Sequence, residues 1–149
     1  MLTQEVKIKK VRENAKIPTY GTDYAAGADL YACLDDNIIL KPGETKLIST
    51  GISLEVPTGY AGLIYARSGL ATKKGLAPAN KVGVVDSDYR GEIMVSLHNH
   101  SNEERIIEPF ERIAQFIITP YLKASFVEVD KLDDNTERGS NGFGSTGRK

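Results

Sequence analysis

The sequence has no tryptophan and only one cysteine and two methionines among its 149 residues. Because Cys33 is the single cysteine, no disulfide can form within the chain, and a reducing, cytoplasmic location is expected. The N-terminal stretch MLTQEVKIKKVREN lacks the apolar run of a signal sequence, and no segment reaches membrane-spanning length. Positive charge is not in excess either, since 19 Lys and Arg accompany 20 Asp and Glu. Neither a nucleic-acid partner nor a membrane is therefore expected, whereas a small anionic ligand needs only a local basic pocket.

Alternation of apolar and polar residues is the dominant pattern, and it predicts β-strands with one buried face. In GEIMVSLH, at 91–98, Ile93, Val95 and Leu97 share one side. The other expected strands are EVKIKK at 5–10, KLISTGISLEV at 46–56, RIAQFIIT at 112–119 and SFVEV at 125–129. Many short strands separated by turns such as KPGE predict one all-β domain, a sandwich or a barrel.

Helical signal is confined to RSGLATKKG, 67–75, where Ser68 is the expected N-cap and Gly75 the expected end. From Asp133 the composition becomes polar and then Gly-rich, finishing with RGSNGFGSTG at 138–147. Four glycines in those ten residues oppose both helix and strand. We therefore expect a domain of residues 1–132 followed by a flexible arm of residues 133–149.

Four internal segments carry polar residues suited to chemistry. AAGADLYA places Asp29 among small residues, and ARSGLA places Arg67 at the start of the helical turn, where backbone N–H groups point outward. NKVGVVDSDYRGE, 80–92, runs from a strand into a turn dense with carboxylates, and ERIAQFIITP places Gln115 on a strand. Taken singly, each has an ordinary structural explanation: a turn residue, a chance tripeptide, a solvated hairpin or a polar strand position.

Three other residues could in principle bind a metal or act as a nucleophile, but the sequence pattern around them does not favour such a role. His98 and His100 share strand parity without a third ligand nearby in the pattern, so surface positions are expected rather than a metal site. Cys33 is expected to be a small buried apolar residue.

The order and spacing of five segments resemble those of the homotrimeric dUTPase family over essentially the whole chain. AGADLYA resembles the first family motif, RSGLA the second, GVVDSDYRGE the third, RIAQ the fourth and RGSNGFGSTG the fifth. Two positions depart from the family pattern: Ala66 replaces a usual proline and Asn141 a usual glycine. Alanine only relaxes a backbone restraint, and asparagine tolerates the left-handed conformation well, so activity is still expected.

The resemblance implies a jelly-roll-like β-barrel with one short helix, assembled as a homotrimer whose sites are shared between subunits. It implies hydrolysis of dUTP to dUMP and pyrophosphate with Mg²⁺, which keeps uracil out of DNA and supplies dUMP for thymidylate synthesis. In the implied site Asp86 is catalytic and deprotonates the attacking water, while Asp29 holds the metal through water. The implied substrate-binding residues are Arg67, Ser68, Gly69, Asn80, Val85, Tyr89, Gln115, Arg138, Phe143, Gly144, Ser145 and Thr146.

Within this implied set, donors to the phosphates come from Arg67, Ser68 and Gln115. Asn80 reads the uracil edge, and the Tyr89 ring packs on the deoxyribose, where a 2′-hydroxyl would collide with it. Ordering the arm costs about 1–2 kcal/mol per residue. Stacking of Phe143 on the uracil returns about 1–3 kcal/mol. The arm is therefore expected to close as a lid only when substrate is bound.

Three alternatives remain. A dCTP deaminase of the same fold would need different base-reading residues and would release ammonia from dCTP. A nucleotide-binding regulatory β-barrel without catalysis would not need a base at Asp86. A purely structural jelly roll would leave the order of the five motifs unexplained.

Overall fold

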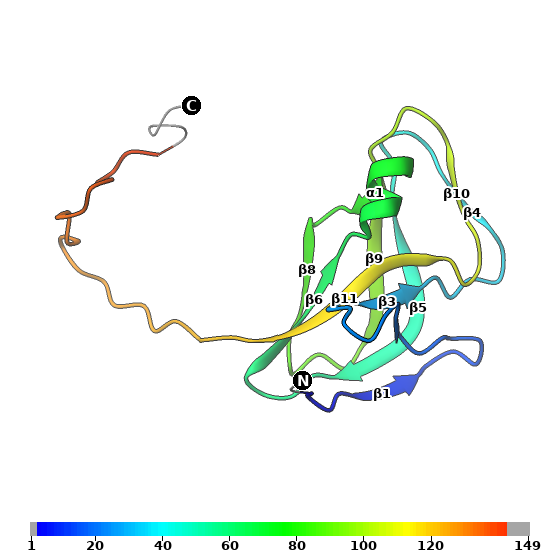
Figure 1. Ribbon diagram of the computed structural model, residues 1–149, viewed down its shortest axis with the longest axis horizontal. Helices are drawn as coiled ribbons and strands as arrows, with labels where there is room; N and C mark the ends of the chain where they lie inside the picture. The colour runs from blue at the N-terminus through cyan, green and yellow to red at the C-terminus, as the bar shows by residue number, and fades with distance from the viewer. Residues whose placement is uncertain (1–2, 143–149) are drawn as a thin grey trace.

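Eleven strands and one helix are the regular elements of the computed structural model, which describes residues 3–142 (Figure 1). The strands are β1 (Lys7–Lys10), β2 (Thr19–Tyr20), β3 (Ala28–Tyr31), β4 (Ile38–Leu40), β5 (Thr45–Glu55), β6 (Tyr60–Tyr65), β7 (Leu76–Pro78), β8 (Val82–Val85), β9 (Glu92–Asn99), β10 (Arg105–Ile107) and β11 (Arg112–Pro120). The helix, α1 (Ser68–Lys74), lies between β6 and β7 in the chain. The predicted mostly β architecture with one short helix is confirmed.

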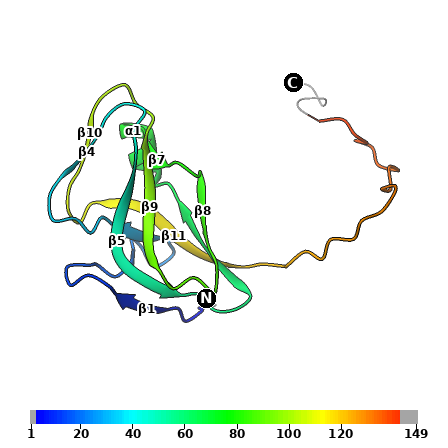
Figure 2. The same cartoon turned by 180° about the vertical axis from the view of Figure 1, so that it is seen from behind.

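The strands form two large sheets and one small one. One sheet has the order β1-β5-β9-β7, the second has the order β2-β3-β11-β6-β8, and β10 pairs with β4. Every pairing is antiparallel. A single apolar cluster draws residues from both large sheets, so the sheets pack against each other around one core. Figure 2 shows β5 and β9 side by side from behind, at the centre of the first sheet.

Burial in β9 follows the predicted alternation, whereas burial in β5 follows it only in part. In β9 the side chains of Ile93, Val95 and Leu97 are buried and those between them are half-buried. In β5 Ile48 and Ile52 are fully buried as predicted, but all residues from 48 to 52 are buried, so the strand is covered on both faces there. Because successive strand side chains point to opposite faces, this pattern fixes which face each strand turns to the core.

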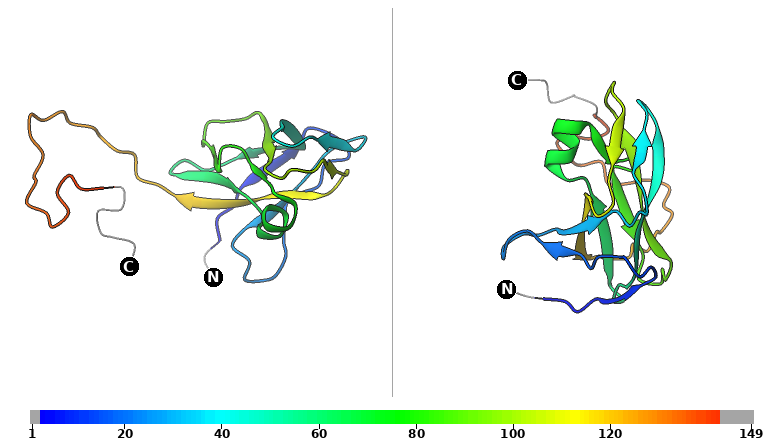
Figure 3. Two further views of the ribbon diagram at one scale, coloured as in Figure 1. Left: turned by 90° about the horizontal axis from the view of Figure 1, so that it is seen from above. Right: turned by 90° about the vertical axis from the view of Figure 1, so that its right-hand side faces the viewer.

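Helix α1 begins one residue earlier than the predicted N-cap at Ser68 requires. Arg67 is the N-cap, with extended backbone and no side-chain cap hydrogen bond, so the prediction of Ser68 as N-cap is wrong. The Arg67 side chain is directed to Asp29 instead, and Ser68 is already helical. Gly75 ends the helix as predicted: it adopts φ 67°, and its N–H donates to the Ala71 carbonyl. The turned view in Figure 3 (right) shows α1 on the outside of the strands.

The chain leaves the barrel after β11. Residues 121–142 contain no strand and run away from the sheets (Figures 1 and 3). The strand predicted at 125–129 is therefore wrong for the single chain, because no other part of the described residues lies beside it to supply hydrogen bonds. Leu122 and Phe126 are 98% and 95% exposed in this segment. The described part of the chain has no helix both long and apolar enough to span a membrane.

Candidate active site

Four of the residues predicted to act on the nucleotide line one cavity of about 220 Å³ beside β8. They are Asn80, Val85, Asp86 and Tyr89. Strand β8 pairs with β6 and is followed directly by Asp86, whose side chain is exposed in the turn. Asn80 lies in the tight connection from β7 to β8. The segment 80–89, which crosses from the sheet of β7 to the sheet of β8, thus brings an amide, a carboxylate and an aromatic ring to one concave surface.

The turn after β8 is held by its own hydrogen bonds. The Tyr89 N–H donates to the Asp86 carbonyl at 3.1 Å. Arg90 Nη1 donates to the carbonyls of Ser87 and Tyr89 at 2.7 and 3.0 Å. Arg90 therefore braces this turn, and the turn presents Asp86 and Tyr89 on a defined backbone.

A second cluster is built around the Asp29 carboxylate on β3. Oδ1 accepts a hydrogen bond from Arg67 Nε at 2.7 Å, and Oδ2 accepts one from Arg112 Nη1 at 3.1 Å. The Asp29 side chain is only 12% exposed, so this carboxylate is largely removed from solvent between two guanidinium groups. Sequence reasoning missed Arg112, although it is the first residue of the RIAQ segment that supplied Gln115.

Gln115 is fixed next to this cluster. Its Nε2 donates to the Ala66 carbonyl at 2.8 Å, immediately before Arg67. A Cβ added at Gly27 would lie 3.0 Å from Gln115 Cδ, so glycine makes the room for this side chain. Since Ala66 contributes its backbone carbonyl to this bond, the absence of the family's usual proline leaves the contact intact.

The residues around Arg67 line a second, more basic cavity of about 450 Å³. Its cationic side chains are Arg67, Lys73, Lys74 and Arg112, and Gly69 contributes to the same wall. Ser68 is exposed in the first turn of α1. Guanidinium and ammonium groups suit a polyphosphate. The two cavities share no lining residue, so one chain does not bring Asp86 into the same pocket as Arg67.

The donors present fit a magnesium ion that arrives with a polyphosphate rather than one held by protein alone. Within residues 3–142 no three His, Cys, Asp or Glu side chains come together as a metal site. Each Asp29 oxygen uses one lone pair on an arginine and keeps another for a metal-bound water.

His98 and His100 lie with ring centroids 4.3 Å apart, and burial lowers the pKa of His100.

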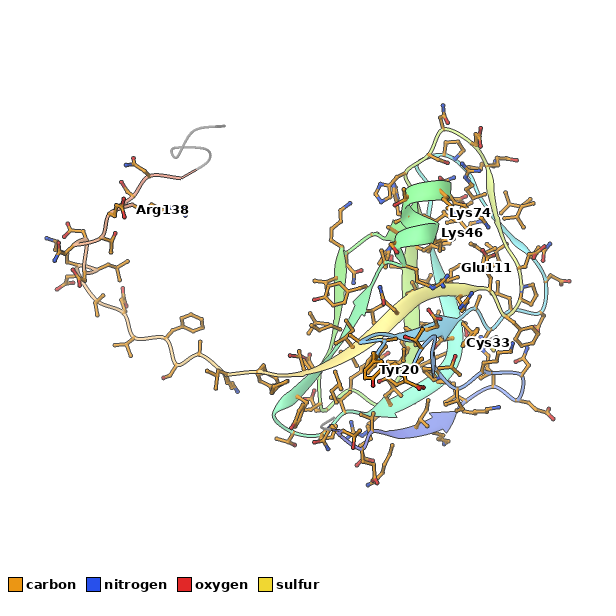
Figure 4. All side chains as sticks on the ribbon, in the orientation of Figure 1. Tyr20, Cys33, Lys46, Lys74, Glu111 and Arg138 are labelled. Atoms are coloured by element: carbon orange, nitrogen blue, oxygen red, sulfur yellow. The ribbon has the colours of Figure 1, made fainter. Side chains whose placement is uncertain are left out.

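The predicted arm residues lie away from both cavities or outside the described part of the chain. Figure 4 shows Arg138 on the extended segment, far from α1 and the sheets. Phe143, Gly144, Ser145 and Thr146 lie outside the described residues. Within the described residues, the predicted site residues therefore lie in two separate cavities, with Arg138 apart from both.

Sequence reasoning also missed Glu92, which lines the first cavity together with Asp86 and Tyr89. Its Oε1 accepts hydrogen bonds from Ser49 Oγ and from the Gly51 N–H. Its place in the DSDYRGE stretch was visible, but its partners on β5 lie more than forty residues away along the chain.

Antiparallel sheets around one core, a short helix and two polar cavities place the chain among mostly β proteins of jelly-roll-like fold. The dUTPase family model matches residues 13–147. The chain is 53% identical over 144 residues to the deoxyuridine 5′-triphosphate nucleotidohydrolase of Nautilia profundicola, covering 97% of this chain and 99% of that protein. It is 52% identical over 142 residues to that of Hydrogenobaculum sp., covering 95% and 97%. The chain therefore belongs to the dUTPase family.

Solved structures agree with this assignment. A variant dUTPase of Staphylococcus bacteriophage 80alpha, determined with dUpNHpp, superposes with a TM-score of 0.87. It is 26% identical, and the match covers 97% of this chain and 99% of the phage chain. The fold, including the course of the chain, is thus shared across distant members of the family.

Proposed function

We propose that this protein hydrolyses dUTP to dUMP and pyrophosphate by attack of water on the α-phosphate. Its family and the names of its close relatives support this reaction. The observation that carries the proposal is the cavity that gathers Asn80, Asp86 and Tyr89 from one short segment of the chain. No finding favours deamination of dCTP.

Asp86 is the proposed general base. Its carboxylate is exposed at the end of β8 and borders the cavity, so a water molecule can reach it from solvent. A carboxylate that accepts a proton from water as the oxygen attacks phosphorus lowers the barrier by stabilising the developing charge. The hydrogen bond from the Tyr89 N–H to the Asp86 carbonyl limits the positions that this residue can take.

Asn80, Val85 and Tyr89 are the proposed base- and sugar-selecting residues. The Asn80 amide offers both a donor and an acceptor to the uracil edge. Val85 is buried and closes the inner wall of the cavity. The Tyr89 ring is 45% exposed, which leaves a face free to pack on the deoxyribose. A ring in that place excludes a ribose by collision with its 2′-hydroxyl.

Arg67, Ser68, Gly69 and Gln115 are proposed to bind the triphosphate. Asp29 aligns Arg67 through Nε, and Arg67 Nη1 donates to the Arg112 carbonyl at 3.4 Å. Nη2 is then the guanidinium nitrogen proposed to reach a phosphate oxygen. When bound with the substrate, Mg²⁺ would supply further neutralisation of phosphate charge, and Asp29 would contact its waters.

A homotrimer with shared sites is part of the proposal. Two features support it: the separate cavities of Asp86 and Arg67, and the exposed apolar side chains of Leu122, Phe126 and Val127 on a segment that packs against no other part of residues 3–142. Light scattering should give the mass of three chains. Mixing Asp86→Asn chains with chains that lack 138–149 should restore activity, because a mixed site can draw its base and its arm from different subunits.

The arm is proposed to close each site. Arg138, Ser145 and Thr146 would contact phosphate oxygens, Phe143 would stack on the uracil, and Gly144 would let the backbone approach closely. The single buried cysteine is consistent with a cytoplasmic location, which belongs to the same proposal.

Pyrophosphate release from dUTP, dTTP, dCTP and UTP, each with and without Mg²⁺, tests the function. We expect rapid release from dUTP with Mg²⁺ and little from the other three nucleotides. Ammonia release from dCTP would support the deaminase instead, and binding of dUTP without turnover would support a regulatory barrel.

A further inference from the structure

Two hydrogen bonds hold Tyr89, one through its backbone and one through its hydroxyl. Its N–H donates to the Asp86 carbonyl at 3.1 Å, and its Oη donates to the Glu92 carbonyl at 2.9 Å. The hydroxyl bond spans three residues and fixes the direction of a ring that is otherwise 45% exposed. An exposed tyrosine without such a bond would sample several rotamers.

Gly91 provides the space in which the ring lies. A Cβ added there would lie 2.6 Å from Tyr89 Cζ and 3.0 Å from Cε2, and the first is closer than real Cβ atoms come to other heavy atoms. The backbone at Gly91 is not in the left-handed region, so conformation does not demand glycine at this position. The demand comes from the tyrosine ring alone.

The backbone carbonyl of Glu92 accepts the hydrogen bond from the Tyr89 hydroxyl, and the Glu92 side chain is bound to the neighbouring strand β5. Its Oε1 accepts hydrogen bonds from Ser49 Oγ and, at 2.8 Å, from the Gly51 N–H, with Arg12 Nε 3.6 Å away. These bonds lie where the β5–β9 register shifts between Ser49 and Ser53, so the carboxylate takes the place of missing ladder bonds. The carbonyl that anchors Tyr89 is thereby fixed to the barrel.

We propose that Gly91 and Glu92 are positioning residues that set the sugar specificity of the site by holding the Tyr89 ring in one orientation. The inference rests on the proposed function, in which this ring packs on the deoxyribose. A ring fixed in advance excludes a 2′-hydroxyl, because it cannot turn aside to make room. A ring free to rotate would accept ribose more readily, and would also lose part of its contact with deoxyribose.

The test compares kcat/KM for dUTP and UTP in purified full-length variants, together with melting temperature. We expect Gly91→Ala to reduce the preference for dUTP over UTP by about tenfold or more, since steric discrimination of small groups is of that size. Tyr89→Phe keeps the ring and loses only its anchor, and should reduce the preference about fivefold. Gly21→Ala is the matched control, because a Cβ there meets nothing within 4 Å.

Two substitutions of Glu92, one conservative and one that removes the side chain, test its role. Glu92→Gln retains an oxygen for Ser49 and Gly51 and should keep most of the preference for dUTP over UTP. Glu92→Ala loses that oxygen and should reduce this preference. A purely structural role would lower stability and leave the ratio of the two substrates unchanged.

The inference is wrong if Gly91→Ala and Glu92→Ala fold and keep the wild-type ratio. If Gly91→Ala does not fold, an unchanged ratio in both Tyr89→Phe and Glu92→Ala overturns it. A wild-type protein that does not hydrolyse dUTP would instead overturn the proposed function and this inference with it.

Discussion

Replacing Asp29 by alanine should disrupt the ion network at the proposed phosphate site. The carboxylate accepts hydrogen bonds from Arg67 at 2.7 Å and from Arg112 at 3.1 Å. A hydrogen bond to a charged group contributes about 1.5–3 kcal/mol when it is shielded from water. Arg67 is 27% exposed and Arg112 is 50% exposed, so the bond to Arg112 is discounted to less than about 1 kcal/mol. We therefore expect a loss of about 2–3 kcal/mol in the free energy of unfolding.

Asp29→Asn separates the charge from the shape of the side chain. The amide oxygen can still accept from Arg67, but the amide nitrogen is a donor facing a second donor on Arg112. We expect a loss of about 1–2 kcal/mol in the free energy of unfolding. Affinity for a non-hydrolysable dUTP analogue should fall in the presence of Mg²⁺, because both the orientation of Arg67 and the acceptor for metal-bound water are impaired.

Urea unfolding at one fixed protein concentration and calorimetric titration of the analogue, with and without Mg²⁺, measure both effects. The concentration is fixed because assembly stabilises the folded state by mass action. Asp36→Asn is the control, since it removes one charge at an exposed bend. If Asp29→Ala unfolded at the wild-type urea concentration and bound the analogue as tightly, the network would have neither role.

Asp86→Asn should leave binding of the analogue within a few-fold of wild type and reduce turnover by roughly two to four orders of magnitude, since the amide cannot accept the proton; near wild-type turnover in a pyrophosphate assay would exclude Asp86 as the base. Deleting 138–149 should leave the melting temperature nearly unchanged and abolish most activity, because the barrel strands end at Pro120; full activity would refute the lid. Burial raises the pKa of Cys33, and Sγ donates to Asn14 Oδ1 at 3.1 Å. The Cys33 thiol should therefore react slowly with a disulfide reagent in the folded protein at pH 8 and rapidly in urea. Equal rates in the two conditions would show that the structure around Cys33 opens readily.

The sequence determined the features that depend on near neighbours. Alternation predicted the buried faces of β5 and β9, because side-chain direction along a strand has a period of two residues. Gly75 predicted the end of α1, because glycine adopts the left-handed conformation at little cost. The five segments and their order also indicated the dUTPase family.

The tertiary structure decided the features that depend on partners far away in the chain. Asp29 meets Arg67 and Arg112 only because β3, β11 and β6 are neighbours in one sheet, and strand order is not encoded in local periodicity. Arg67 rather than Ser68 precedes the first helical turn, and its side chain bonds to Asp29 across the sheet instead of capping the helix. The apolar 125–129 segment has strand-like composition, yet it forms no strand here, because pairing requires a partner edge that the described chain does not supply.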